Sequence, residues 1–211
     1  MGPGAHLEVN ETAGTVAYDM RNAAHGPGSA RWDVALRVAD GGSLRWDALP
    51  LVVANGADVQ RCTTVQLGVG TALWLRETLV LGRTREAGGR VRSRLDVRRE
   101  IPVLVEATDS ADFSSRVMDS LLVIGQESVG GMRLEAGGTL LRSLTDDTHL
   151  SSIDPGEVAT TSTAGPACER RPLTATPPSL AAPRALVVLA ANQPSRGAVS
   201  GFRSHHLPEQ Q

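Results

Sequence analysis

Apolar and polar residues alternate along much of the first two-thirds of the chain. In the segment 31–38 every second residue is apolar: Trp32, Val34, Leu36 and Val38. After the pair Gly41-Gly42, the segment 43–48 repeats the pattern with Leu44, Trp46 and Ala48. A period of two is typical of a strand with one buried face. The glycine pair predicts a turn, so we expect these two strands to pair with each other as a hairpin.

The same pattern predicts further strands along the chain. They span residues 59–67, 71–81, 90–99 and 140–144. The segment 101–107 is almost wholly apolar, as in a strand that is buried on both faces. Residues 117–124 predict a strand, with a short helix as the alternative, and residues 146–153 favour a short helix.

Glycine-rich turns separate these segments at roughly the 8–12 residue spacing that is expected of all-β domains. No long apolar stripe with helical periodicity competes with them. The sequence therefore predicts a mainly β protein with stacked, antiparallel sheets and few short helices.

The composition changes after Pro155. Residues 156–211 are rich in Pro, Thr and Ala, which is typical of irregular chain. We therefore predict a β-rich domain over 1–155 and a largely irregular tail over 156–211. The apolar run 185–191 is the candidate element within this tail.

Composition and charge argue against several classes of function. Hydrophobic residues make up 41% of the 211 residues and aromatic ones only 3%, so the core must consist mostly of Val, Leu and Ala. The formal net charge of −2 gives no reason to expect nucleic acid or an anionic membrane as a partner. The longest apolar run is too short to span a bilayer, and Cys62 and Cys168 form no CxxC pair. We expect a soluble protein of the cytoplasm.

Glu77 interrupts an apolar face. In the strand 71–81 it shares one face with four leucines, Leu73, Leu75, Leu79 and Leu81. A buried carboxylate must be paired, protonated, hydrated or placed at an interface, because leaving it unpaired is costly. An ion pair with Arg92 or Arg94 is the structural explanation.

Glu106 presents the same problem, because it closes the apolar run 101–105. A structural ion pair again explains it. Two inward carboxylates on neighbouring strands could instead line a hydrated path for a divalent cation. Oxygen ligands hold a divalent transition-metal ion loosely compared with thiolate or imidazole, which suits transit better than storage.

Four arginines lie on one face of the strand 90–99: Arg90, Arg92, Arg94 and Arg98. Aromatic residues are not interleaved with them, so a nucleic-acid site is disfavoured. We expect a solvated or ion-paired strand face, which could also dock a protein.

The sequence contains no local catalytic motif. The patterns GxSxG, HExxH and GxxxxGK[ST] are absent, and the histidines have no spacing typical of metal ligands. These absences argue against an enzyme. A hydrolase that uses Cys62 is the alternative, and an imidazole within hydrogen-bonding reach of the thiol would support it.

Five segments, in order, resemble the UreD (UreH) family of urease accessory proteins. They are 44–57 (LRWDALPLVVANGA), 62–67 (CTTVQL), 73–83 (LWLRETLVLGR), 89–97 (GRVRSRLDV) and 103–106 (VLVE). The most specific is 73–83, which is similar to a family strand that ends in L-x-L-G-R.

The resemblance implies a β-rich scaffold of stacked sheets with no catalysis of its own. Such a protein would associate with UreF, through it with the nickel-binding GTPase UreG, and with apo-urease. Nickel would pass through its interior, and Glu77 and Glu106 match acidic positions along that passage. The resemblance thus implies transient Ni²⁺ binding at these two residues and no stably bound cofactor.

The chain also departs from the family pattern. No segment matches the family's PPGGIVGGD-like motif, so we expect the family's N-terminal strands to be missing from the domain 1–155. Arg45 stands where the family usually has Glu, and the family's C-terminal helix and strands are not recognisable in 156–211. The alternative reading is a generic all-β interaction module with structurally paired glutamates and no metal role. An arginine-capped Glu77 would favour this alternative, whereas a polar tunnel would favour the nickel path.

Overall fold

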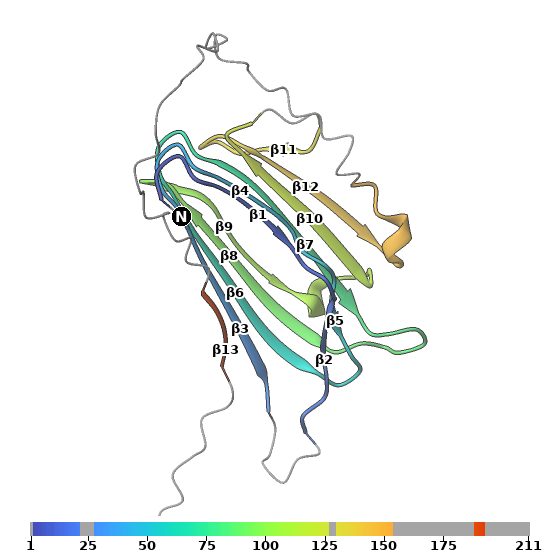
Figure 1. The fold of residues 1–211 in the computed structure, drawn as a ribbon. Coiled ribbons are helices and arrows are strands. Elements are labelled where there is room, and N and C mark those ends of the chain that lie inside the picture. Colours follow the sequence, from blue (N-terminus) through green and yellow to red (C-terminus); the bar gives the residue numbers. More distant parts are fainter. Residues whose placement is uncertain (1, 22–27, 127–129, 154–187, 193–211) are drawn as a thin grey trace, which may run out of the picture.

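The computed structural model describes residues 2–21, 28–126, 130–153 and 188–192, which form two β-sheets stacked face to face (Figure 1). This confirms the mainly β prediction. The helices of the described residues are two short 3₁₀ turns, η1 (Ser110–Asp112) and η2 (Thr148–Leu150). None of the helices in these residues is long and apolar enough to cross a membrane.

Sheet A has eight strands. They are β1 (His6–Asn10), β2 (Thr15–Ala17), β4 (Ser43–Asp47), β5 (Leu51–Val53), β7 (Ala72–Leu81), β10 (Val117–Ile124), β11 (Met132–Arg133) and β12 (Thr139–Thr145). Their order is β1-β4-β7-β10-β12-β11, while β5 lies beside β7 and carries β2 on its other edge.

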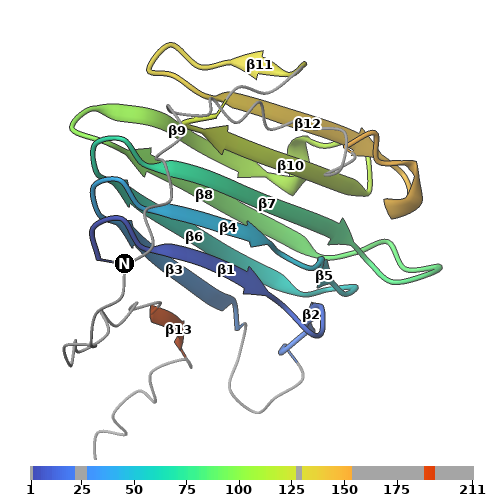
Figure 2. The same ribbon diagram turned by 45° about the horizontal axis from the view of Figure 1, so that its top comes forward.

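Sheet B has five strands in the order β13-β3-β6-β8-β9. They are β3 (Ala30–Val38), β6 (Asp58–Leu67), β8 (Arg90–Arg98), β9 (Pro102–Asp109) and β13 (Val188–Asn192). The two sheets lie one behind the other in Figure 2.

The chain winds between the sheets as a coil. It passes from β3 in sheet B to β4 in sheet A, back to β6, and on to β7. Ala30 pairs with Val59 and Ser43 pairs with Ala72, which is a step of 29 positions in each case. One turn of the coil therefore adds a strand to each sheet, and neighbouring turns run parallel.

The predicted hairpin of 31–38 with 43–48 is wrong, because β3 and β4 lie in different sheets. Antiparallel pairing is confirmed for β8–β9, β7–β10 and β10–β12, but β1–β4, β4–β7, β3–β6 and β6–β8 are parallel. The glycine pair forms an arch between the sheets and not a turn within one of them. Alternation shows which face of a strand is buried, but it does not identify the neighbouring strand.

The arches of successive coil turns stack on each other. Gly41 donates its N–H to the carbonyl of Val69, and Gly68 donates to the carbonyl of Val38. The carboxylate of Asp40 accepts the N–H of Val69 at 2.9 Å. Gly41 has a φ of +65°, a conformation that glycine adopts without the steric cost of a side chain. These bonds hold the turns in register.

The core lies between the sheets and is built mostly from Val and Leu, as predicted. Its larger part contains Val34, Leu36, Val38, Leu44, Trp46, Val65, Leu67, Leu73, Leu75, Val97, Leu122 and Ile124, among others. A second cluster contains Leu51, Val53, Val59, Leu79, Val91 and Met118. Polar side chains such as Glu77 and Ser120 lie between the two clusters, and Trp32 packs against both.

The strand that is buried on both faces is β10 and not, as predicted, the segment 101–107. All eight residues of β10 are buried. By contrast β9 is an edge strand whose outer face meets solvent, where Val105 is 44% exposed. Apolar composition alone did not distinguish the two, because what covers the outer face of a sheet is a tertiary feature.

Most of the predicted tail, 156–211, lies outside the described residues, and so does Cys168. Its described part is the backbone of β13, which overlaps the apolar run 185–191 and pairs with β3. Of the segment 146–153, for which a short helix was predicted, the 3₁₀ turn η2 covers three residues.

The packing of β10 predicts a large difference between two leucines. Leu122 is 1% exposed, whereas Leu144 in the neighbouring strand is 50% exposed. We expect Leu122→Ala to lower the free energy of unfolding by about 2–5 kcal/mol, because it leaves a cavity, while Leu144→Ala costs clearly less. Urea unfolding of both variants measures this. Equal losses would show that the sheets do not pack as described.

Candidate functional site

A layer of polar side chains crosses the space between the sheets. In sheet A the strand register places Glu77, Ser120 and Arg142 side by side on three neighbouring strands. In sheet B it places Arg61 beside Ser93. Each of these residues lies on the face of its strand that carries the core residues, so its side chain points into the interior.

Glu77 lies at the centre of this layer and is 8% exposed. Arg61 Nη2 from β6 lies 2.7 Å from Glu77 Oε1, and the Thr63 hydroxyl donates to the same oxygen at 3.0 Å. The contact joins the two sheets. The predicted inward position of Glu77 is confirmed.

The predicted partners of Glu77, Arg92 and Arg94, are wrong. Both project from the outer face of sheet B, where Arg92 pairs with Asp58 and Arg94 with Asp96. Arg61 is the partner because it lies on the inward face of β6, facing β7 of the other sheet.

Glu106 forms the second ion pair of the layer. Both guanidinium Nη atoms of Arg142 bind its carboxylate, and the Nη2–Oε2 distance is 2.7 Å. Arg142 Nε donates to the Ser120 hydroxyl at 3.0 Å. The hydrogen bond with Glu106 raises the pKa of Arg142, burial opposes this, and the charge of Glu77 adds to the rise. The negative charges of both glutamates therefore act on Arg142.

We call the side chains of Arg61, Thr63, Glu77, Ser120, Arg142 and Glu106 the polar layer. Its formal charge is balanced, since it contains two arginines and two glutamates. The side chains of Arg61 and Glu77 are 6% and 11% exposed, whereas those of Arg142 and Glu106 are 28% and 24% exposed. The layer thus runs from the centre of the molecule to the side where β9 and β12 lie.

The polar layer offers carboxylate oxygens, but each carboxylate is bound by an arginine. In the part of the chain that the structure describes, no three His, Cys, Asp or Glu side chains gather where they could hold a metal ion. The layer does not form a ready-made chelating site. A cation could bind the glutamates only by competing with Arg61 and Arg142.

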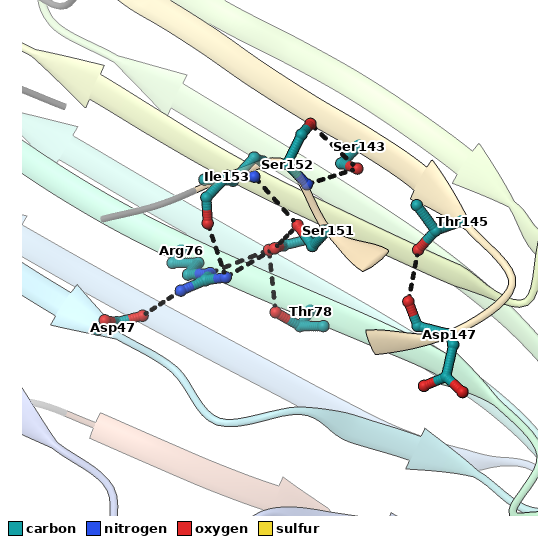
Figure 3. A network of polar contacts seen from close by, with 10 residues as sticks. Asp47, Arg76, Thr78, Ser143, Thr145, Asp147, Ser151, Ser152 and Ile153 are labelled. Atoms are coloured by element: carbon teal, nitrogen blue, oxygen red, sulfur yellow. Dashed lines mark hydrogen bonds and ion pairs between the residues drawn. The ribbon is translucent and has the colours of Figure 1, made fainter. Parts of the chain in front are cut away.

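A second buried carboxylate network lies on the outer face of sheet A, and sequence reasoning missed it (Figure 3). Asp119 is 1% exposed and accepts hydrogen bonds from Arg76 Nη2 at 2.7 Å, Thr78 at 3.0 Å and Ser151 at 2.6 Å. Asp119 is the lone charged residue in the apolar run 117–124, so the argument used for Glu77 would have identified it.

This network holds the chain after β12 against sheet A. Arg76 Nη2 also donates to the Ile153 carbonyl at 3.4 Å. The Ile153 side chain packs with Trp74, Leu121 and Val123. The segment thereby covers the outer face of β10.

The outer face of sheet B carries an open cleft of about 540 Å³ beside Cys62. The arginines that β8 presents on this face are ion-paired, as predicted for the strand 90–99: Arg90 with Asp109, Arg92 with Asp58, and Arg94 and Arg98 with Asp96. Cys62 is a free thiol, and the described residues that line the cleft include no histidine. The cleft therefore gives no support to a cysteine hydrolase.

Comparison with known proteins identifies the family. The family model described as UreD urease accessory protein matches residues 1–170. The chain belongs to the UreD family. The UreD resemblance of the five segments is thereby confirmed.

Several UreD relatives are similar over part of their length. The chain is 39% identical over 140 residues to urease accessory protein UreD 1 of Streptomyces griseus, which covers 63% of this chain and 52% of that protein. It is 36% identical over 152 residues to a UreD of Frankia casuarinae, covering 62% and 46%. The chain spans about half the length of these curated relatives.

The Arg61–Glu77 pair predicts a strong coupling in stability. Glu77→Leu should lower the free energy of unfolding by about 3–5 kcal/mol, because Arg61 is left as an unpaired buried charge. The double variant Arg61→Met/Glu77→Leu should recover much of this loss, since both charges are gone. Urea unfolding in a double-mutant cycle measures the coupling. Additive losses would contradict a direct pair.

The Asp119 network predicts a pH dependence. Burial pushes the pKa of Asp119 upward, but hydrogen bonds from Arg76 and Ser151 outweigh this and hold it below its ordinary value of 3.8. The stabilisation is therefore present above the unfolded-state pKa and is lost as the pH falls through the lower, folded-state pKa. The difference in unfolding free energy between wild type and Asp119→Asn should shrink below about pH 4. A difference that stays constant on acidification would contradict this.

Proposed function

We propose that this UreD-family chain is a non-catalytic scaffold for the insertion of nickel into apo-urease, acting together with UreF and UreG. Family membership over residues 1–170 carries this proposal. In this role the chain works in the cytoplasm through protein partners, without nucleic acid, membrane or a stably bound cofactor.

Within this function, the polar layer is the route of the nickel ion. Glu77 and Glu106 act as transient oxygen ligands, which bind Ni²⁺ weakly enough to release it. Three features support this route: the two carboxylates share one layer, the layer crosses an otherwise apolar core, and its outer end is partly exposed.

A second candidate is a protein-interaction module in which both glutamates are purely structural. The observation that favours it is that each glutamate is paired with an arginine, by Arg61 at the centre and by Arg142 at the edge. Buried charges are usually paired, so pairing alone needs no nickel. The two candidates make different predictions for urease.

The nickel route predicts a specific loss in the double variant Glu77→Gln/Glu106→Gln. Glutamine keeps the size of the side chain but removes the charge that attracts Ni²⁺. When the variant is produced with UreF, UreG and apo-urease, we expect the complex to assemble and the nickel content of urease to fall by about tenfold or more. Co-purification and elemental analysis of the urease measure the two quantities.

Asp119→Asn is the matched control, because it neutralises a buried, arginine-paired carboxylate outside the polar layer. It should leave the nickel content near that of wild type. Normal nickel content in the double glutamine variant would rule out the route and favour the structural module. An equal loss in Asp119→Asn would assign the defect to instability.

A further inference from the structure

The two arginines of the polar layer supply the charge that one divalent cation would supply. Glu77 and Glu106 together carry two negative charges, and Arg61 and Arg142 balance them. Ni²⁺ carries the same charge as the two guanidinium groups. A nickel ion that enters the layer beside both arginines would leave it with two excess positive charges in a region of low dielectric, which is strongly unfavourable.

Arg61 is incompletely satisfied in its pair with Glu77. Its Nε is buried and, within the described residues, has no hydrogen-bond partner. Its guanidinium carbon lies 5.5 Å from the centre of the Trp32 ring, within the range of a cation–π interaction. The ring face offers the guanidinium a stabilising contact that does not require Glu77.

Arg142 has a comparable second contact. Its Nε binds the Ser120 hydroxyl independently of Glu106, and its side chain is more exposed than that of Arg61. The arginine could therefore give up the carboxylate while it keeps one hydrogen bond and reaches water. Each arginine thus keeps a second contact when a cation takes its carboxylate: Arg61 with the Trp32 ring and Arg142 with the Ser120 hydroxyl.

We infer that Arg61 and Arg142 are exchangeable counter-ions, which close the polar layer to cations at rest and are displaced when a divalent cation binds Glu77 and Glu106. This inference rests on the proposed nickel route and adds its regulation. One dication balances the two carboxylates as the two guanidinium groups do at rest, and Arg142, whose side chain is 28% exposed, can carry its charge out to water. A monovalent cation compensates only half of the charge, so the same exchange discriminates against Na⁺ and K⁺.

The inference predicts that removing the arginines strengthens binding of a divalent cation. Equilibrium dialysis of the full-length chain with Ni²⁺ alone tests this on Arg61→Met, Arg142→Met and the double variant. We expect the double variant to bind Ni²⁺ about tenfold more tightly than wild type or better, because its two carboxylates are no longer neutralised. Adding Glu77→Gln and Glu106→Gln should abolish the gain. The tail 156–211 contains two adjacent histidines, His205 and His206, which could bind Ni²⁺. The tail is the same in every variant, so its contribution cancels in the comparison.

Arg76→Met is the matched control, since it frees the buried Asp119 outside the polar layer. It should bind Ni²⁺ as wild type does. Folded arginine variants with wild-type affinity would overturn the inference, and so would an equal gain in Arg76→Met. If Arg61→Met does not fold, as judged by circular dichroism and cooperative unfolding, Arg142→Met at the more exposed pair decides the question.

This result is separable from the test of the nickel route. Tighter binding by the arginine variants, together with normal urease nickel in Glu77→Gln/Glu106→Gln, would reject the route but keep the counter-ion exchange. Unchanged binding with low urease nickel would keep the route and reject the exchange.

Discussion

The structure depends on the register in which successive turns of the coil stack. Because the arches at 39–42 and 68–71 are hydrogen-bonded to each other, equivalent positions of neighbouring turns are held at the same level. Apolar positions then continue from turn to turn as apolar rows, as where Leu36 lies beside Val65 and Leu44 beside Leu73. The polar layer extends this alignment beyond the arches: the antiparallel register of β7, β10 and β12 places Glu77 beside Ser120 and Arg142 in sheet A, and the parallel register of β6 and β8 places Arg61 beside Ser93 in sheet B.

Buried carboxylates in this fold are neutralised by two different arrangements of donors. Asp119 accepts hydrogen bonds from three side chains, and these bonds hold the segment after β12 against sheet A. Glu77 and Glu106 each depend on one arginine from the opposite sheet. The first arrangement is richly bonded and closed, whereas the second has fewer bonds and reaches the edge.

Sequence reasoning gave the fold class and the inward position of Glu77, because alternation along a single strand determines both. It failed where the answer depended on another part of the chain. Gly41-Gly42 is compatible with a hairpin or with an arch, and only the neighbouring turn decides between them. Arg61 could not be identified as the partner of Glu77, because the pair joins strands of different sheets. The burial of 117–124 depends on Ile153, which folds back from beyond the next strand.

The ion pair between Glu106 and Arg142 has a further consequence for the behaviour of the protein in solution. It joins β9, the last strand of sheet B, to β12. Among the described residues, β12 beyond its first residues has a strand partner on one side only. Unpaired strand edges invite other chains to add to a sheet, and charged side chains that point inward from an edge oppose this. A strand that added to either edge would bury this ion pair more deeply. It would remove water from the two charged groups without supplying other hydrogen-bond partners. The exposed end of the polar layer is therefore also a barrier to self-association.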